Sequence, residues 1–209
     1  GAVYDKSSLY EKAIADYNKA VELKPDYADA YNNRGLVFER LGQNQKAIAD
    51  FSKAISLNPI FVDAYNNRVV VYSAQGRYDL AVSDLNKAIS ANPDSLKSYI
   101  NRAAIYAKLN QYEEVARNLT EVIRLQPDND LFYYNRGFAY AKTGQYNAAL
   151  NDFNKTLRLK DNHADAYNIR AAVYLNQHNI ISGCLDAKKA CELGNCSTLK
   201  VVKARGLCR

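Results

Sequence analysis

Four cysteine side chains could bind a metal ion or form disulfides, and all of them lie in the last 26 residues: Cys184, Cys191, Cys196 and Cys208. Cys184 and Cys191 are seven residues apart in an expected helix, about 10 Å along its axis, which is too far for four sulfurs to reach one zinc ion. Gly194 is expected to end that helix, and residues 198–205 to form a short helix that folds back on it. This hairpin would bring Cys196 near Cys191 and Cys208 near Cys184, so two disulfides are expected, with free thiols as the alternative.

Disulfides would place the chain in an oxidising compartment, either the periplasm or the extracellular space, whereas free thiols would fit the cytoplasm.

Few other residues in the sequence could take part in catalysis or bind a cofactor. The two histidines, His163 and His178, lie near expected turns, and no set of nucleophile, base and oxyanion donors and no phosphate-binding loop is present. We therefore expect a protein that is not an enzyme, with no cofactor and no bound metal.

The four prolines, Pro25, Pro59, Pro93 and Pro127, are each 34 residues from the next. A period of this length indicates stacked units that each lack a complete core. Complete units are expected at 28–61, 62–95, 96–129 and 130–163, followed by a degenerate fifth unit at 164–197 that has lost its proline. Residues 1–27 would be a partial repeat, mainly a second helix, and residues 198–209 a C-terminal capping helix, all in one solenoid domain.

Each unit repeats the same pattern of large and small side chains. Positions are counted from the first residue of each unit, so that residue 28 is position 1 of the first complete unit. Position 4 is always tyrosine and position 11 is always aromatic, while positions 8 and 20 are mostly small. Spacings of three, four and seven residues indicate two amphipathic helices per unit, of about 13 and 14 residues. Glycine or asparagine at position 15 marks the turn between them.

This pattern of aromatic, glycine, alanine and proline residues resembles the tetratricopeptide repeat family, in the form common in bacteria, as in the sequence AYNNRG at residues 30–35. The resemblance implies an all-α fold, a right-handed superhelical solenoid of antiparallel helix pairs. It also implies that the first helices line a concave groove that binds a peptide or protein. The expected function is thus a non-catalytic protein–protein interaction scaffold.

Opposite charges recur at two positions of the repeat. Position 7 is arginine in every complete unit, and position 23 is acidic in all but one case. An arginine between two helices needs a carboxylate partner, so we expect structural ion pairs, with anion binding by the arginine row as the alternative. The residues of these pairs are Arg34, Arg68, Arg136 and Arg170 with Asp50, Asp84, Asp152 and Asp186.

Asparagine recurs at position 6, as Asn33, Asn67, Asn101 and Asn135. Asparagine is a mediocre helix former, and its carboxamide offers the donor and acceptor that complement a peptide group. We expect this asparagine ladder to hold the backbone of an extended peptide, as similar ladders do in the family it resembles. The alternatives are hydrogen bonds to neighbouring helices and simple inheritance from an ancestral repeat.

The family's groove positions differ between units, which would set specificity. They include Asn32 and Asn66 in the first two units and Ile100, Tyr134, Phe138, Lys108 and Lys142 in the next two. The groove is therefore expected to run from polar and acidic to apolar with basic edges. Tyr134 and Phe138 lie one helical turn apart and are the best candidates for a pocket that takes an apolar side chain. Packing against an adjacent first helix is their alternative role.

The net charge of +6 raises the question of nucleic-acid binding, but residues 180–209 carry six basic and two acidic side chains and account for most of it. We expect no nucleic-acid binding and, because no apolar run is long enough, no insertion into a membrane.

Because the sequence contains no methionine, we expect it to be a segment of a longer chain. Because residues 1–6 match only the end of a first helix, the N-terminal edge is expected to leave a helix face uncovered. That face could pair with a second copy, so the alternative function is self-assembly into a homo-oligomer.

Overall fold

A computed structural model describes residues 2–208 of the chain, with side chains from residue 9 onward. This part of the chain contains twelve α-helices and no strands, which confirms the expected all-α class. The helices are α1 (Ala2–Leu23), α2 (Ala28–Arg40), α3 (Asn44–Leu57), α4 (Val62–Ala74), α5 (Tyr78–Ala91), α6 (Leu96–Lys108), α7 (Tyr112–Leu125), α8 (Asp130–Lys142), α9 (Tyr146–Leu159), α10 (Ala164–Asn176), α11 (Ile180–Glu192) and α12 (Ser197–Ala204).

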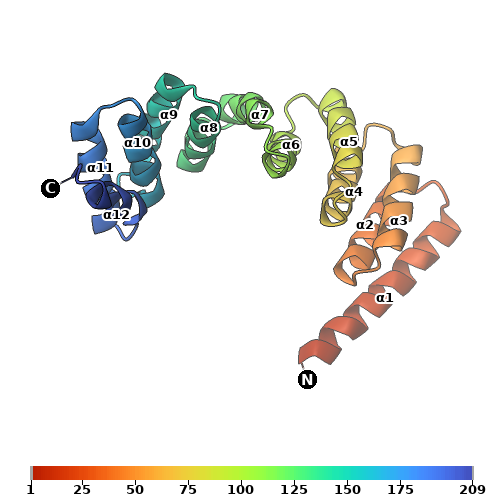
Figure 1. The fold of residues 1–209 in the computed structure, drawn as a ribbon. Helices are drawn as coiled ribbons and strands as arrows, with labels where there is room; N and C mark the ends of the chain where they lie inside the picture. The colour runs from red at the N-terminus through yellow and green to blue at the C-terminus, as the bar shows by residue number, and fades with distance from the viewer. Residues whose placement is uncertain (1, 209) are drawn as a thin grey trace. The chain divides into compact units, whose positions relative to one another are not determined.

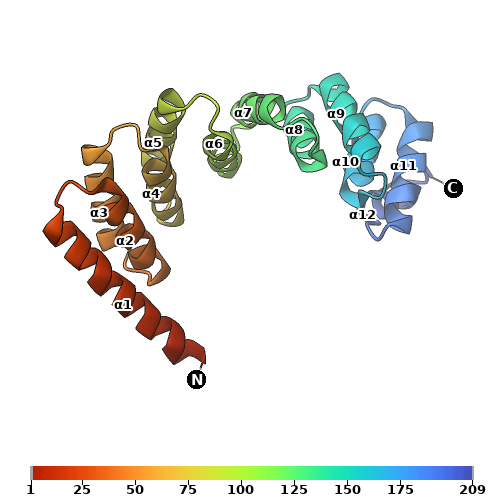
Figure 2. The same cartoon turned by 180° about the vertical axis from the view of Figure 1, so that it is seen from behind.

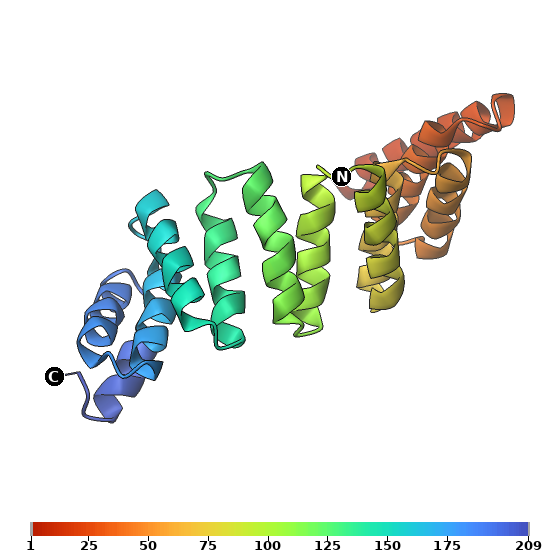
Figure 3. The same cartoon turned by 90° about the horizontal axis from the view of Figure 1, so that it is seen from above.

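The chain divides into two compact units, residues 1–105 and 106–209, and the division falls inside α6. In unit 1, α2 packs on α3 and α4 packs on α5, while α1 contacts α2 and α3 contacts α4 (Figure 1). In unit 2, α8 packs on α9 and α10 on α11, and α12 covers α10 and α11 at the C-terminal end (Figures 2 and 3). Consecutive helices therefore pack in pairs, as the two-helix repeat predicts.

The turns between the paired helices need a left-handed backbone at one residue. Gly42 takes this conformation with φ 69°, and Asn110 and His178 occupy the equivalent position with φ 57° and φ 60°. Glycine adopts this region without steric cost, and asparagine is among the residues that tolerate it best. The long second helices end differently. Asn58 after α3 is extended, the conformation that the proline after it favours, and Lys160 after α9 takes the same conformation before Asp161.

The core of each repeat is formed by the second helix against the first. Ala47, Phe51 and Ala54 on α3 are completely buried, and the equivalent side chains of α5 and α9 are buried equally. Alanine at the first and third of these positions lets two helices approach closely, while the larger residue between them fills the space. The buried positions follow the 34-residue register from which the helices were predicted.

Helix α1 is one unbroken helix, so residues 2–6, which were expected to be the end of a first helix, continue directly into the second helix of the partial repeat. The helices of the described chain include none with the length and apolar character needed to cross a bilayer. Nor do histidine, cysteine, aspartate and glutamate residues in that part of the chain form a group of three that could hold a metal ion.

Candidate functional site

The arginine row is built into the packing of the helices. Arg68 on α4 donates from Nε and Nη2 to the two carboxylate oxygens of Asp84 on α5, both at 2.7 Å. The two side chains are only 13% and 5% exposed. This two-pronged geometry is the strong form of an arginine–carboxylate pair. The same pair recurs, at 2.7–2.8 Å, as Arg34–Asp50, Arg136–Asp152 and Arg170–Asp186.

Each arginine also reaches back to the preceding repeat. Nη1 of Arg68 donates to Oγ of Ser52 on α3 at 2.7 Å, and Nη1 of Arg34 donates to Asn18 on α1 at 2.8 Å. The same contact joins Arg102 to Asn86, Arg136 to Thr120 and Arg170 to Asn154. One guanidinium thus links its own first helix to the second helices of two successive repeats. Sequence reasoning predicted the aspartate partner and missed this second one, although position 25 is polar in each repeat.

The ion pair also changes the pKa of its arginine. Hydrogen bonding to Asp50 raises the pKa of Arg34 above its usual value, against the opposing effect of burial. With Nε and Nη2 directed to Asp50 and Nη1 to Asn18, three guanidinium donors are used inside the protein. This geometry favours the structural role over anion binding.

The asparagine ladder forms hydrogen bonds between successive first helices in unit 1. Asn67 on α4 donates from Nδ2 to Oδ1 of Asn32 on α2 at 2.9 Å, and Asn101 on α6 donates in the same way to Asn66 on α4 at 2.9 Å. Asn66 is fully buried and also donates to Oγ of Ser98 at 2.8 Å. The position 5 asparagines, expected in the groove, therefore lie in the contact between helices.

The position 6 asparagines keep part of their hydrogen-bonding capacity. Asn67 and Asn101 are half-buried, and each uses one N–H on its neighbour, which leaves Oδ1 and a second N–H. Asn33 and Asn135 are exposed. Nδ2 of Asn32 contacts Oδ1 of Asn33 at 3.4 Å, and Asn135 has no side-chain hydrogen bond within residues 2–208. The 35-residue spacing between paired asparagines is the sequence signal for these bonds.

The structure separates Tyr134 and Phe138, although both lie on α8. The ring of Tyr134 lies 4.7 Å from the ring of His163 and 6.1 Å from that of Phe153, so it packs toward α9 and the start of α10. Burial raises the pKa of Tyr134, and the charge of Asp165 adds to this rise. The ring of Phe138 meets that of Tyr112 on α7 edge to face at 6.1 Å.

The two rings therefore belong to separate contacts. Tyr134 meets His163 at the start of α10, a first helix, as the packing alternative expects, whereas Phe138 meets α7, a second helix. The remaining groove residues lie at the surface. Ile100 is half-buried, while Lys108 and Lys142 are exposed. Nζ of Lys142 lies over the Phe138 ring, 5.2 Å from its centre, so a basic group faces that ring. This combination of apolar ring and ammonium group suits a ligand with apolar and acidic groups.

Two disulfides are present at the C-terminal end, with the pairing expected from the sequence. Cys184 on α11 is bonded to Cys208, and Cys191 is bonded to Cys196, so α12 and the residues after it are fastened to α11. Cys208 joins Ala171, Ala187, Leu199 and Val202 in a buried cluster. The capping helix therefore covers the apolar end of the last repeat, which would otherwise face water.

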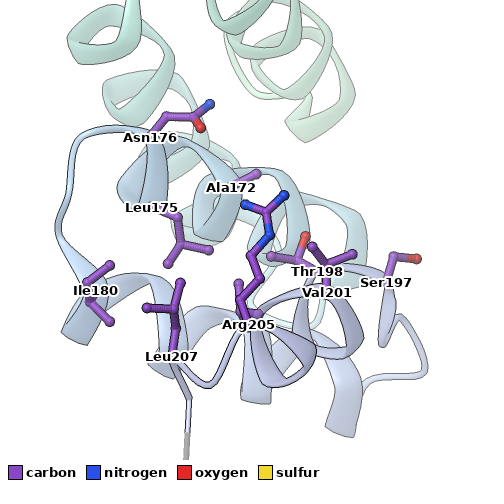
Figure 4. A pocket seen from close by; sticks show the side chains of 10 residues that line it. Ala172, Leu175, Asn176, Ile180, Ser197, Thr198, Val201, Arg205 and Leu207 are labelled. Carbon is purple, nitrogen blue, oxygen red and sulfur yellow. The ribbon is translucent and has the colours of Figure 1, made fainter.

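Two cavities lie in unit 2. One, of about 330 Å³, is lined mainly by apolar residues of α10 and by α12, and Figure 4 shows its lining. The other, of about 570 Å³, lies between α9 and α10 and is lined mostly by polar groups, including Asn151, Asn154, Arg158 and Arg170. Arg170 is engaged with Asp186 and Asn154, so the second cavity is an opening beside the structural ion pair.

Comparison with solved structures shows the same fold in other proteins. YrrB, described as a TPR protein with an unusual peptide-binding site, superposes with a TM-score of 0.80 at 22% identity over 90% of this chain and 97% of its own. MamA from Desulfovibrio magneticus RS-1 superposes with a TM-score of 0.70 at 18% identity over 79% of this chain and 94% of its own. None of the curated proteins matches the chain in sequence.

Sequence profiles of one repeat family match the chain without a gap from residue 2 to residue 163. Profiles described as TPR repeat match residues 2–42 and 105–144, and profiles described as tetratricopeptide repeat match residues 28–61, 62–95, 85–115 and 131–163. The helix pairs, the buried small and aromatic positions and these matches agree. The chain belongs to the tetratricopeptide repeat family.

Proposed function

We propose that the chain is a non-catalytic scaffold that holds an extended peptide or partner segment on the face formed by its first helices. The tetratricopeptide repeat fold supports a role in protein interaction. The observation that carries the finer proposal is the orientation of Asn67 and Asn101 by Asn32 and Asn66. Each bond fixes a carboxamide at the surface and leaves one acceptor and one donor for a ligand.

The spacing of the ladder suits an extended backbone. Packed helices lie roughly 8–10 Å apart, and an extended chain advances about 3.3 Å per residue. Successive asparagines would therefore meet every third peptide group of a bound segment. Because a carboxamide matches a peptide group of any residue, this grip is independent of the ligand's side chains.

Selectivity would come from the variable residues beside the ladder. Val70 on α4 is 47% exposed and Leu131 on α8 is 50% exposed, so apolar contacts are available in both units. Phe138 with Lys142 adds an aromatic ring and a positive charge. Ligands that combine apolar and acidic side chains should bind best.

The test is a peptide-array screen of the wild-type chain, followed by affinity measurements on the best peptides. The double change Asn67→Ala and Asn101→Ala should weaken binding at least tenfold, because two oriented carboxamides are lost. Asn67→Ala and Asn32→Ala form a matched pair of single variants, since both remove the same inter-helix hydrogen bond and only Asn67→Ala removes the carboxamide that meets the ligand, so Asn32→Ala should cost less affinity. Unchanged affinity in the double variant would contradict the ladder, and equal losses in the two single variants would assign it a structural role.

A second candidate function is assembly with another copy through α1. Ala13 and Tyr17 on α1 are half-buried, whereas Ala47 and Phe51 at the equivalent positions of α3 are completely buried. Leu9 on the same helix is 63% exposed. An uncovered apolar face of this kind favours pairing. Sedimentation over a hundredfold range of concentration would show a dimer that Tyr17→Lys removes, and a monomer throughout would contradict it.

We place the protein in the periplasm or outside the cell, with the cytoplasm as the alternative. The two disulfides support this location, since reducing compartments keep thiols free. The intact mass of the purified protein should rise by one hydrogen per sulfur after reduction. An unchanged mass would remove the support for an oxidising compartment.

A further inference from the structure

The apolar cavity of unit 2 lies between α10 and α12, at the C-terminal end of that unit. It has a volume of about 330 Å³, at the small end of the usual range for ligand pockets. Ala172 and Leu175 on α10 form one side and Val201 on α12 the opposite side, and Ile180 and Leu207 close the end (Figure 4). The size and lining suit one or two aliphatic groups.

The cavity has a charged group at its edge. Figure 4 shows the side chain of Arg205 running from the end of α12 toward Ala172, so its guanidinium is part of the cavity lining. Within residues 2–208, Arg205 forms no ion pair. No acidic residue lines the cavity, and α12 itself carries Lys200 and Lys203 without an acidic residue. The opening therefore favours a negative charge on its occupant.

One wall of the cavity depends on a disulfide. Leu207 directly precedes Cys208, which is bonded to Cys184 on α11. Ile180 lies one helical turn before Cys184, on the same face of α11. The disulfide thus holds Leu207 alongside Ile180, together with the hydrogen bond from the Leu207 N–H to the carbonyl oxygen of Val202 at 3.0 Å, while Leu207 itself is 43% exposed.

We propose that this cavity binds an aliphatic side chain of a peptide, with Arg205 pairing with an adjacent aspartate or glutamate, and that the Cys184–Cys208 disulfide maintains the site. The inference rests on the proposed function and deepens it. Ala172 and Leu175 occupy repeat positions 9 and 12, where the earlier repeats carry candidate groove residues. A peptide lying on the first helices of unit 2 would reach the cavity as it crosses α10, and an acidic residue would complement Arg205.

The probe for this site is the capped peptide acetyl-Gly-Ser-Leu-Glu-Ser-Gly-amide, titrated into the whole oxidised chain and followed by methyl NMR. Signals of Leu175, Ile180, Val201 and Leu207 should shift. Replacing leucine by alanine in the probe should weaken binding at least tenfold, because the buried aliphatic group is lost. Replacing glutamate by lysine in the probe should weaken binding about twofold to fivefold, which is the range for an exposed ion pair.

Matched variants separate the parts of the proposal. Ala172→Leu fills the cavity and should abolish the shifts, while Arg205→Gln should remove the preference for glutamate. Lys203→Gln, on the same helix but outside the cavity lining, should retain it. Cys184→Ser with Cys208→Ser should abolish binding. Cys191→Ser with Cys196→Ser should preserve it, because Thr198 of the lining stays hydrogen-bonded to Asn168 on α10. Circular dichroism would show that each variant keeps its helices.

The outcomes also distinguish this site from the asparagine ladder. Shifts at other methyl groups, or binding that survives Ala172→Leu, would overturn the cavity as the site. If longer peptides bind through the ladder while the probe leaves these four residues unshifted, the proposed function stands and the cavity does not. If the probe binds but Asn67→Ala and Asn101→Ala leave longer peptides unaffected, the cavity stands without the ladder.

Discussion

Gly35 on α2 lies so close to Phe51 on α3 that a Cβ atom at residue 35 would be 2.7 Å from Cε1 of the ring. Gly137 and Phe153 repeat this relationship in unit 2, where the corresponding distance is 3.0 Å. In the second repeat the same two positions hold Val69 and Leu85, which share one buried cluster. The large residue on the second helix is thus matched by the absence of a side chain on the first, and a smaller one by valine.

Gly35→Val should therefore destabilise unit 1 by about 1–3 kcal/mol, because the new side chain overlaps the buried ring. Phe51→Leu alone should also destabilise it, because it leaves unfilled space. The double variant recreates the Val69–Leu85 pair and should be more stable than the sum of the single effects predicts. Urea unfolding of the four proteins measures this coupling, and strictly additive losses would contradict the size match.

Arg68→Leu should destabilise the protein by about 3–5 kcal/mol, because it leaves the buried carboxylate of Asp84 without its partner. Pairing it with Asp84→Leu should recover much of the loss, since no buried charge then remains. Arg40→Leu, at an exposed position of α2, is the control and should change stability by no more than about 0.5 kcal/mol. A loss of peptide affinity without a loss of stability in Arg68→Leu would favour anion binding.

Tyr134 should ionise at a higher pH than an ordinary tyrosine in an alkaline titration. Burial raises its pKa above the usual value of 10.0, and Asp165 raises it further. Above pH 10 the unfolded chain loses this proton while the folded chain keeps it, so the free energy of unfolding falls as pH rises. Tyr134→Phe should reduce this fall and remove one late step from the tyrosine absorbance titration. Asp165→Asn should move that step to lower pH, and an unchanged titration in Tyr134→Phe would contradict the assignment.

The two disulfides should contribute unequally to the stability of the C-terminal end. Cys184 and Cys208 are 24 residues apart in sequence, whereas Cys191 and Cys196 are five apart. Loop-closure entropy then gives about 3.5 kcal/mol for the longer loop and about 2 kcal/mol for the shorter one. Hydrogen exchange in α11 and α12 should accelerate more in Cys184→Ser with Cys208→Ser than in Cys191→Ser with Cys196→Ser. Equal acceleration would mean that loop length does not set the difference.

The helices that follow α1 could be predicted from the sequence because they depend on local properties. Pro59 restricts Asn58, and the left-handed residue after each first helix is glycine, asparagine or histidine. The partner of Arg68 was also predictable, because Asp84 follows it by 16 residues within one helix pair, and the same spacing of arginine and aspartate recurs in other repeats. A short antiparallel pair leaves few choices of neighbour.

The partners of side chains at the edges of the helices were decided only by the tertiary structure. Asn67 was expected to face a ligand, whereas its Nδ2 donates a hydrogen bond to Asn32 of the preceding repeat. Tyr134 lies one turn from Phe138 on α8 but packs against His163.

The same sequence period allows a side chain to face the groove or the next helix, and the choice depends on how adjacent helices are rotated and spaced. The period therefore determines the repeat, its helices and its internal pairs, while the contacts between repeats and the cavity beside Arg205 arise only when the helices are packed together.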